Sequence, residues 1–565
     1  MNALLDGSLG FKLQVWCYTL LHSGTGLGAL YATTALFSLA GLRQGRAKIS
    51  HYFLWPMLTV PLTAGVWGLF EALLWGLPRL GVPLSLIGVI MLAAILAMLS
   101  GLVGGLLWAR RGQALDGAQR RGAIVTDGAA AQNSSAKQRV SAIKSAKQAP
   151  ASRAQFPITI AGVTMPLKDE VMHTKIAGTT GTGKSTAIRE MVHAALYRQD
   201  RAVIADPDAG YLSRFYDPRR GDVILNPFDA RSAKWDPFSE IKAPYDIEEL
   251  ARALIPDRDG PDSQWISYGR TFLGCVLGQM KQAGMSDVGE LYRLLTAAPK
   301  AELKLLLAGT AAARFLEEGS DKQFAGTQSI TADHVKCLDY IRRQPPSAAP
   351  FSISTWVKSG RGVLFLPYRA DQIAALRSII SVWMRITISK TLSLPEGDAR
   401  IWFIIDELDA LGTIDGLSDA LTRLRKFGGR CVIGFQSIAQ ISTRYGSGVA
   451  QAVVENCGNT LILRCSASEN GGTSRFASAL IGVREVVRLA NSRSQSSRVA
   501  SGGDQLTQGQ SEQHASEPAV LASEIEQLPD RTGFLKLASQ PAWMKVQFPY
   551  YDVPKVAEPF VGIDE

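Results

Sequence analysis

The chain has 565 residues, which at roughly 100–200 residues per domain excludes a single small module and leaves room for about three to five folding units. Charged residues make up only 19% and apolar types 46%, so part of the chain is expected to lie in lipid. Six cysteines and six histidines are scattered without a C-x-x-C pair, which argues against a disulfide scaffold or a zinc module. The net charge of +10 falls largely in residues 109–155. It does not by itself indicate a nucleic-acid surface, because basic residues beside a membrane also follow from the positive-inside rule.

Three apolar runs predict membrane-spanning helices over residues 24–42, 53–76 and 82–108, within a membrane domain of residues 1–108. The third run has 27 uncharged residues, longer than the about 20 that cross a bilayer, and this length argues against the alternative of core helices in a soluble domain. The glycine-rich first run is less distinct, so two or three spans remain open. Basic residues before the second run and after the third place the large C-terminal part in the cytoplasm.

The residues after the last apolar run predict a basic, flexible linker over 109–155. They are rich in Ala, Ser, Gln and Gly with dispersed Lys and Arg, and the sustained apolar periodicity of a packed element is absent. Contact of this linker with anionic lipid headgroups or with DNA is an alternative to simple solvation.

Residues 178–186 carry the sharpest motif, Gly-Thr-Thr-Gly-Thr-Gly-Lys-Ser-Thr, which fits G-x-x-x-x-G-K-[ST] between a strand-like and a helix-like segment. Glycines let the backbone approach phosphate oxygens, and the following helix points its positive end at the anion. Lys184 is expected to bridge the β- and γ-phosphates of ATP, and the Ser185 hydroxyl to ligate Mg²⁺. The predicted nucleotide-binding residues are Gly178, Thr179, Thr180, Gly181, Thr182, Gly183, Lys184, Ser185 and Thr186.

The second half of such a site is predicted at residues 401–407, where five apolar residues precede Asp406 and Glu407. A fully apolar run is typical of a strand that is covered on both faces. Asp406 is expected to hold Mg²⁺ through a water, and Glu407 to polarise the attacking water. Further apolar runs at 202–205, 223–225, 363–366, 431–435 and 461–463 predict a doubly wound, mainly parallel sheet. Ligands of such sheets bind at the carboxyl ends of the strands, which makes Asp206, Gln436 and Arg464 additional site candidates.

The chain from Lys184 to Asp406 is longer than two or three strand–helix repeats of about 30 residues require, which predicts an insertion. Helical apolar spacings fill residues 241–354 and predict an all-α domain there, dividing the nucleotide-binding domain into 156–240 and 355–550. Residues 491–517, rich in Ser, Gln and Gly, are interpreted as a mobile loop, and the acidic tail 551–565 as a solvated end, with binding of a partner as the alternative.

The order of these motifs resembles the type IV coupling proteins of conjugation and type IV secretion, the TrwB/TraD/TraG family, over nearly the whole chain. Besides the two phosphate motifs, the resemblance rests on Ile204-Ala-Asp206-Pro-Asp208, Val223-Ile-Leu-Asn226-Pro227-Phe-Asp229, Trp265 with Ser267-Tyr-Gly-Arg270, Leu392-Ser-Leu-Pro395 and Gly434-Phe-Gln436-Ser437. The resemblance implies an α/β fold: a RecA-like P-loop nucleotide-binding domain with an inserted all-α domain, preceded by N-terminal transmembrane helices.

The family also implies a function, namely a DNA-dependent ATP hydrolase and translocase that forms a homo-hexamer in the bacterial inner membrane. ATP hydrolysis would move single-stranded DNA with its bound relaxase into the type IV secretion channel, with membrane lipid around the anchor. Gln436 is similar to the γ-phosphate sensor of relatives. Arg425 matches the position of an arginine finger that reaches into the neighbouring subunit, where its charge would meet the phosphoryl transition state. The alternative for Arg425 is a solvated cation on an amphipathic helix.

The sequence departs from the simplest family pattern in its extra apolar run and in the turn Asp208-Ala-Gly210. Two other functions are considered. In the first, the protein is a docking receptor that recruits relaxase or effector proteins, and nucleotide binding serves mainly for assembly. In the second, it is a chromosome-directed pump of the related FtsK/HerA branch, which would need a sequence-reading module that is not recognisable after the last strand.

Overall fold

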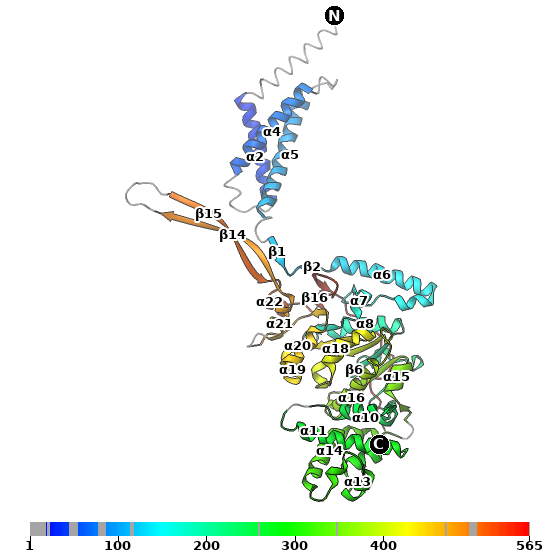
Figure 1. Ribbon diagram of the computed structural model, residues 1–565. Coiled ribbons are helices and arrows are strands. Elements are labelled where there is room, and N and C mark those ends of the chain that lie inside the picture. Colours follow the sequence, from blue (N-terminus) through cyan, green and yellow to red (C-terminus); the bar gives the residue numbers. More distant parts are fainter. Residues whose placement is uncertain are drawn as a thin grey trace. The chain divides into compact units, whose positions relative to one another are not determined.

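A computed structural model describes residues 19, 23–44, 55–76, 86–113, 118–257, 260–345, 348–468, 472–496 and 505–563. The chain divides into two compact units (Figure 1). The first comprises residues 1–122 with 484–517, and the second comprises residues 123–483 with 518–565.

Three helices lie side by side in the first unit: α2 (Gly24–Gln44), α4 (Trp55–Gly76) and α5 (Leu86–Gln113) (Figure 1). Among the described residues, α2 alone is long and apolar enough to cross a membrane, and the apolar parts of the other two are shorter, Thr59–Leu73 and Met91–Leu107. This finding is consistent with an N-terminal membrane anchor, while the number of spans stays a prediction. The predicted beginnings of the second and third runs lie outside the described residues.

Small residues let α2 and α5 approach closely. A Cβ added at Gly101 would lie 2.5 Å from the carbonyl oxygen of Thr34, and one at Gly105 would meet the carbonyl oxygen of Ser38. Gly101 and Gly105 form a G-x-x-x-G pair, the spacing that membrane helices use for backbone-to-backbone packing.

The predicted mobile loop at 491–517 is wrong for the residues that the structure describes there. Strand β1 (Ala118–Gly122) pairs with β14 (Val483–Ser496), and β14 pairs with β15 (Gln505–Pro518). Glu517 forms ion pairs with Arg484 and Arg488 across the hairpin. Backbone pairing does not require apolar side chains, so a polar composition was a poor guide to the absence of strands.

A ten-stranded sheet organises the second unit, in the order β2-β17-β16-β13-β5-β12-β11-β6-β10-β7. Its strands are β2 (Val125–Asp127), β17 (Trp543–Gln547), β16 (Thr532–Lys536), β13 (Asn459–Ile462), β5 (Thr174–Ala177), β12 (Arg430–Phe435), β11 (Ile401–Ile405), β6 (Arg201–Pro207), β10 (Val363–Tyr368) and β7 (Val223–Ile224). The strands from β13 to β7 are parallel, as predicted, while β16 pairs antiparallel with both β13 and β17. The sheet is therefore mixed.

The central strands are buried on both faces, which explains their unbroken apolar sequences. In β11, Phe403 and Ile405 face one core, and Trp402 and Ile404 face the other.

The second unit also contains the helices α6 (Ala129–Gln148), α7 (Leu167–Glu170), α8 (Lys184–Tyr197), α9 (Leu212–Phe215), α15 (Ile353–Ser359), α16 (Ile373–Thr391), α17 (Leu408–Leu411), α18 (Leu417–Phe427), α19 (Ile438–Tyr445), α20 (Ser447–Glu455), α21 (Gly472–Ile481) and α22 (Ala522–Glu526). Short 3-10 helices lie at Pro150–Gln155, Pro218–Arg220, Pro237–Glu240 and Ala313–Leu316. Thr159–Ile160 and Val163–Thr164 form a two-stranded ladder.

The insertion is helical, as predicted. Its elements are α10 (Pro244–Leu254), α11 (Ser263–Gln282), α12 (Val288–Thr296), α13 (Lys300–Leu306) and α14 (Asp321–Arg342) (Figure 1). The two-residue strands β8 (Lys234–Trp235) and β9 (Pro350–Phe351) pair where the chain enters and leaves this lobe.

The prediction of a flexible linker over 109–155 is wrong from residue 118 onward. Helix α6 packs on the second unit through polar side chains: Gln132 Nε2 donates to the carbonyl oxygens of Ala161 and Gln547 at 2.8 and 2.9 Å, and Ser135 Oγ accepts from the Thr164 N–H. The apolar residues of α6 that pack on this unit are small, among them Ala131 and Ala142, so no strong apolar periodicity marks the helix in the sequence.

The acidic tail is attached to the second unit over the described residues 552–563, although its acidic residues Asp552 and Glu558 are exposed to solvent. The backbone N–H of Val556 donates to the carbonyl oxygen of Ser213, and that of Ala230 donates to the carbonyl oxygen of Val561. The tail is held by its backbone, so the acidity of its side chains did not report its position.

Candidate functional site

The phosphate motif forms the predicted strand, loop and helix. Strand β5 ends at Ala177, and α8 begins at Lys184. Gly181 and Gly183 have φ angles of 79° and 113°, which only glycine adopts freely. A Cβ at Gly183 would also lie 2.9 Å from Arg531 Cγ, so the close approach of a second segment demands glycine there.

Lys184 points into the loop that precedes it. Its Nζ donates to the carbonyl oxygens of Gly178 and Thr179 at 2.6 and 3.2 Å. Burial lowers the pKa of Lys184, and the carboxylates of Asp406 and Glu407 oppose this shift. The loop thus holds a cation within reach of two carboxylates.

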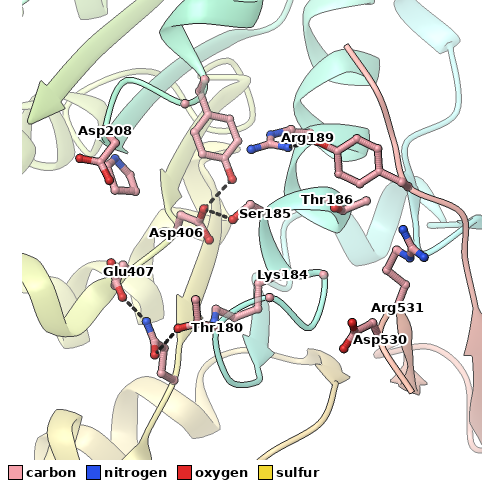
Figure 2. Close-up of a pocket in the computed structure, with 17 residues that line it drawn as sticks. Thr180, Lys184, Ser185, Thr186, Arg189, Asp208, Asp406, Glu407, Asp530 and Arg531 are labelled. Atoms are coloured by element: carbon pink, nitrogen blue, oxygen red, sulfur yellow. Dashed lines mark hydrogen bonds between the residues drawn. The ribbon is translucent and has the colours of Figure 1, made fainter. Parts of the chain in front are cut away.

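Asp406 and Ser185 meet, as the sequence predicts. Ser185 Oγ donates to Asp406 Oδ2 at 2.7 Å, and the Tyr211 hydroxyl donates to the same oxygen at 2.9 Å (Figure 2). The other carboxylate oxygen, Asp406 Oδ1, is buried and has no hydrogen-bond partner within the described part of the chain. A buried carboxylate oxygen without a partner is costly unless it is satisfied by a ligand.

These oxygens fit a magnesium ion. Mg²⁺ prefers oxygen ligands and is commonly held by one or two carboxylates together with waters and phosphate oxygens. No cluster of three or more His, Cys, Asp or Glu side chains suited to a metal occurs among the described residues, so a closed all-protein metal cage is not found there. Ser185 and Asp406 are the residues that would hold the ion, with Asp406 Oδ1 as the open position.

Glu407 is linked back to the phosphate loop by a chain of hydrogen bonds. Gln436, which follows β12, donates through Nε2 to Glu407 Oε1, and Thr180 Oγ1 donates to Gln436 Oε1 at 3.0 Å. Burial raises the pKa of Glu407, as do Asp409 and Asp406, while Gln436 and Lys184 act in the opposite direction. A carboxylate with a raised pKa is better suited to accept a proton.

A cavity of about 550 Å³ joins these groups (Figure 2). Of the predicted residues, Thr180, Gly181, Gly183, Lys184, Ser185, Thr186, Asp406, Glu407 and Gln436 line it. Gly178, Thr179 and Thr182 belong to the loop but do not line the cavity, and they contribute carbonyl groups that hold Lys184 Nζ and the N–H of Arg531.

Eight further residues line the cavity that the sequence motifs did not assign to it: Arg189, Pro207, Asp208, Gly210, Tyr211, Asp530, Arg531 and Tyr550. Arg189 could have been found, because it lies four positions after Ser185 on the same face of α8. Arg531 has a φ of 58°, and its N–H donates to the carbonyl oxygen of Thr182 at 2.8 Å. It comes from the segment before β16 and carries no motif.

Three predicted residues lie elsewhere. Asp206 is completely buried and accepts from the N–H groups of Tyr211 and Leu212, and burial raises its pKa to about 7. Arg464 does not line the cavity but forms an ion pair with Asp530, which does. Arg425 is exposed on α18 and does not line the cavity of its own chain, so its role stays a prediction.

The fold and the site together define a class of protein. A glycine-rich loop follows β5, and an acidic pair follows β11, with strand β12 between these two strands in the sheet. The side chains of the loop and of the acidic pair meet at the carboxyl ends of the parallel strands. This is the arrangement of a RecA-like P-loop nucleotide-binding protein.

Comparison with known proteins identifies the family. The profile of the type IV secretion-system coupling protein DNA-binding domain matches residues 157–549, and the chain belongs to this family. Coupling protein TraD of Escherichia coli (strain K12) is 31% identical over 403 residues, covering 70% of this chain and 55% of TraD. Conjugal transfer protein TraG of Escherichia coli is 23% identical over 273 residues, covering 42% of this chain and 43% of TraG. The chain thus spans about half the length of the curated relatives it matches.

Solved structures of the plasmid coupling protein TrwB have the same fold. A form named TrwBdeltaN70 is 30% identical, with a TM-score of 0.66 over 78% of this chain and 96% of TrwB. TrwB in complex with the non-hydrolysable ATP analogue ADPNP is 30% identical, with a TM-score of 0.66 over 79% of this chain and 98% of that one. TrwB has also been solved with ADP and Mg²⁺, at 30% identity and a TM-score of 0.65 over 78% of this chain and 96% of that one.

Proposed function

We propose that this coupling protein is a membrane-anchored ATPase that drives conjugative transfer of single-stranded DNA with its bound relaxase into a type IV secretion channel. The observation that carries the proposal is the meeting of Ser185 and Asp406 beside Lys184, with one buried carboxylate oxygen left open. Similarity to TrwB, which binds an ATP analogue, ADP and Mg²⁺, supports ATP and Mg²⁺ as the ligands here.

Each residue has a role in this proposal. The backbone of the phosphate loop cradles the phosphates, and Lys184 exchanges its carbonyl partners for β- and γ-phosphate oxygens. Ser185 and Asp406 hold the magnesium ion, which when bound neutralises charge on the phosphates. Glu407 accepts a proton from the attacking water, and Gln436 orients that water and senses the γ-phosphate.

A hexamer completes the proposed site. Arg425 lies on the exposed face of α18, and within the described chain it forms no ion pair, so its charge is available to a neighbouring subunit. A cation supplied in trans would stabilise the negative charge of the phosphoryl transition state. Hydrolysis at subunit borders would move DNA through the centre of the ring.

The proposed location is the bacterial inner membrane, with the nucleotide-binding unit in the cytoplasm. The apolar helix α2 and the basic residues around the apolar runs support this orientation. Because DNA would be gripped mainly through its phosphates, DNA stimulation of ATP hydrolysis should fall steeply with salt and depend little on base sequence.

The test is ATP turnover by the full-length protein in detergent, with and without single-stranded DNA. We expect DNA-stimulated turnover that Lys184→Ala abolishes together with nucleotide binding. Glu407→Gln should lose turnover but retain binding, because its role lies in water activation. Glu524→Gln, which changes an exposed acid outside the cavity, is the matched control.

Two outcomes would contradict the proposal. Turnover at the parental rate by Glu407→Gln would remove that carboxylate from the mechanism. Slow turnover that DNA does not change would favour the docking receptor, in which nucleotide serves assembly.

A further inference from the structure

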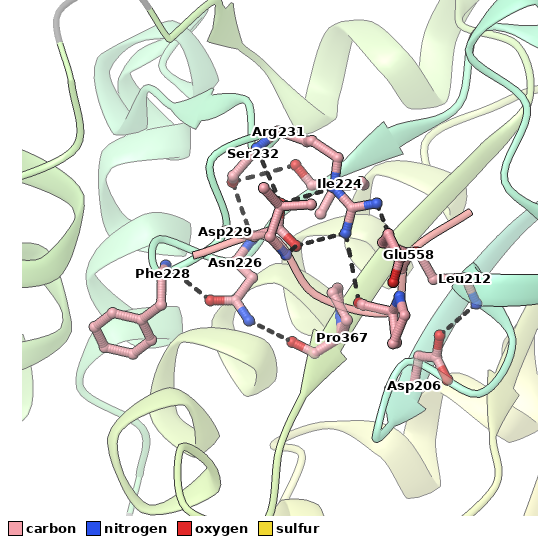
Figure 3. Close-up of polar contacts among 12 residues, drawn as sticks. Asp206, Leu212, Ile224, Asn226, Phe228, Asp229, Arg231, Ser232, Pro367 and Glu558 are labelled. Carbon is pink, nitrogen blue, oxygen red and sulfur yellow. Dashed lines mark hydrogen bonds and ion pairs between the residues drawn. The ribbon is translucent and has the colours of Figure 1, made fainter. Parts of the chain in front are cut away.

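The C-terminal strap, residues 552–563, is fastened to the nucleotide-binding unit along its length. The N–H groups of Val556 and Ala557 both donate to the carbonyl oxygen of Ser213, at 2.8 and 3.2 Å. Farther along, Arg231 Nη1 donates to the carbonyl oxygen of Glu558 at 2.8 Å, and the Val561 N–H donates to Asp229 Oδ2 at 3.3 Å (Figure 3). Backbone groups make these contacts, so the strap is a defined structural element.

Beneath the strap lies the Asp206 turn, residues 206–213, which is held in an unfavourable conformation. Asp208 and Ala209 are consecutive non-glycine residues with φ angles of 52° and 51°, in the left-handed region that residues with a Cβ avoid. Asp206 Oδ1 accepts from the N–H of Tyr211 at 2.9 Å. Its Oδ2 accepts from the N–H of Leu212 at 2.6 Å (Figure 3). Strained backbone of this kind persists only where the surroundings hold it, and it concentrates at functional sites.

The strap supplies part of those surroundings. A cavity of about 250 Å³ is walled by Asp208 and Ala209 of the turn and by Pro559 and Phe560 of the strap. Arg369 also lines this cavity, and its guanidinium lies 5.4 Å from the centre of the Phe560 ring. Phe560 thus lines the same cavity as the strained residues.

The inner face of the same turn reaches the nucleotide site. The Tyr211 ring is 1% exposed, and its hydroxyl donates to Asp406 Oδ2, the oxygen that also accepts from Ser185. Asp208 and Tyr211 both line the nucleotide cavity. Tyr211 thus links the turn to Asp406, whose other carboxylate oxygen, Oδ1, is the open one.

We propose that the C-terminal strap contributes to nucleotide binding by holding the Asp206 turn in place. Tyr211 of that turn then acts as a positioning residue, which orients Asp406 toward the metal that accompanies the nucleotide. The inference rests on the proposed function for the identity of that metal, Mg²⁺. It assigns a role to a segment outside both phosphate motifs. It predicts that loosening the strap reduces the increase in ADP affinity that Mg²⁺ causes, while the contacts to the phosphates stay intact.

Binding of ADP to the full-length protein, measured by titration calorimetry with Mg²⁺ and with EDTA, separates these contributions. Tyr211→Phe removes the hydroxyl alone, and we expect the Mg²⁺ enhancement of ADP affinity to fall about tenfold, the usual effect of losing a partner of a metal ligand, with affinity in EDTA unchanged. Phe560→Ala should act in the same direction. Lys555→Ala, an exposed strap residue, is the control and should match the parent.

Hydrogen exchange provides a readout that does not involve the nucleotide. In Phe560→Ala, the amides of Tyr211 and Leu212 should exchange faster, because the turn opens more often once its outer wall is removed. Ala209→Gly in the Phe560→Ala background should restore part of the Mg²⁺ enhancement, since glycine adopts the left-handed conformation without help. The double variant Tyr211→Phe with Phe560→Ala should be no weaker than Tyr211→Phe alone, because both act through one hydrogen bond.

The inference is overturned if Phe560→Ala keeps both the parental exchange rates and the parental Mg²⁺ enhancement, or if its effect adds fully to that of Tyr211→Phe. Failure of the proposed function would give a different result in the calorimetry. The parent would then show no Mg²⁺ enhancement of ADP binding at all, while the exchange rates would still decide whether the strap clamps the turn.

Discussion

Protonation of one buried histidine should destabilise the nucleotide-binding unit in mild acid. His173 Nε2 donates to the carbonyl oxygen of Leu421 on α18 at 2.8 Å, and its Nδ1 accepts from the N–H of Cys431 on β12 at 3.1 Å. Such a pair of contacts requires the neutral ring. Burial lowers the pKa of His173 from 6.5 to about 4, a shift that the hydrogen bond to Leu421 opposes and the charge of Arg425 favours.

The magnitude follows from linkage. Between pH 6.5 and 4 the unfolded chain binds the proton and the folded chain does not, so the free energy of unfolding falls as the pH falls. The lowered pKa, about 4 against 6.5 unperturbed, corresponds to about 3 kcal/mol at roughly 1.4 kcal/mol per unit. The stabilisation is fully present above pH 6.5, is lost progressively toward pH 4, and does not change further below.

The assay is the thermal unfolding midpoint of the parent and of His173→Asn from pH 8 to pH 4. Asparagine tolerates the positive φ of 54° at this position and does not titrate. The variant should be less stable at pH 8 by about 1–3 kcal/mol, because a buried N–H or carbonyl group loses its partner, but its midpoint should fall less steeply in acid. Ile433→Val on β12 is the control, since it destabilises without changing a titrating group. The reasoning would be refuted if the unfolding midpoints of the parent and of His173→Asn fell equally steeply between pH 8 and pH 4.

Three further predictions concern the site and the helix bundle. Gln436→Ala should lower ATP turnover by about 10²-fold, the lower range for a lost transition-state contact, with ADP affinity retained in calorimetry; weaker ADP binding would instead make Gln436 a ground-state contact. Arg425→Ala should be nearly inactive alone, and mixing it with Lys184→Ala subunits should restore part of the turnover if the cation acts in trans; absence of rescue at every mixing ratio would count against that role. Gly105→Leu should separate α2 from α5 and lower the melting temperature in detergent, whereas Gly68→Leu, where nothing lies within 4 Å of an added Cβ, should not; equal effects would argue against close helix packing.

The sequence predicted the centre of the nucleotide site well for a physical reason. Apolar strands that end in polar residues place those residues at one edge of a parallel sheet, so Lys184, Ser185 and Asp406 could be expected to meet although they are far apart in the chain. Phosphate chemistry also restricts the residue types and their spacing within the loop.

The outer parts of the site could not be predicted because they depend on backbone contacts. The strap reaches Ser213 through N–H groups that every residue except proline carries, so its sequence shows only acidity. Arg531 and Tyr550 enter the cavity because β16 pairs antiparallel with β13 and β17 pairs antiparallel with β16, pairings that leave no local motif. Helix α6 was missed for a similar reason, because Gln132 and Ser135 dock it through hydrogen bonds.

The most direct test of the central claim is a crystal structure of the protein with ADP and Mn²⁺, in which anomalous scattering locates the metal. We predict the metal peak between the diphosphate and the oxygens of Ser185 and Asp406, with Lys184 Nζ moved from the carbonyl groups of its loop to the β-phosphate. A nucleotide bound outside this cavity, or a metal peak remote from both Ser185 and Asp406, would contradict the account.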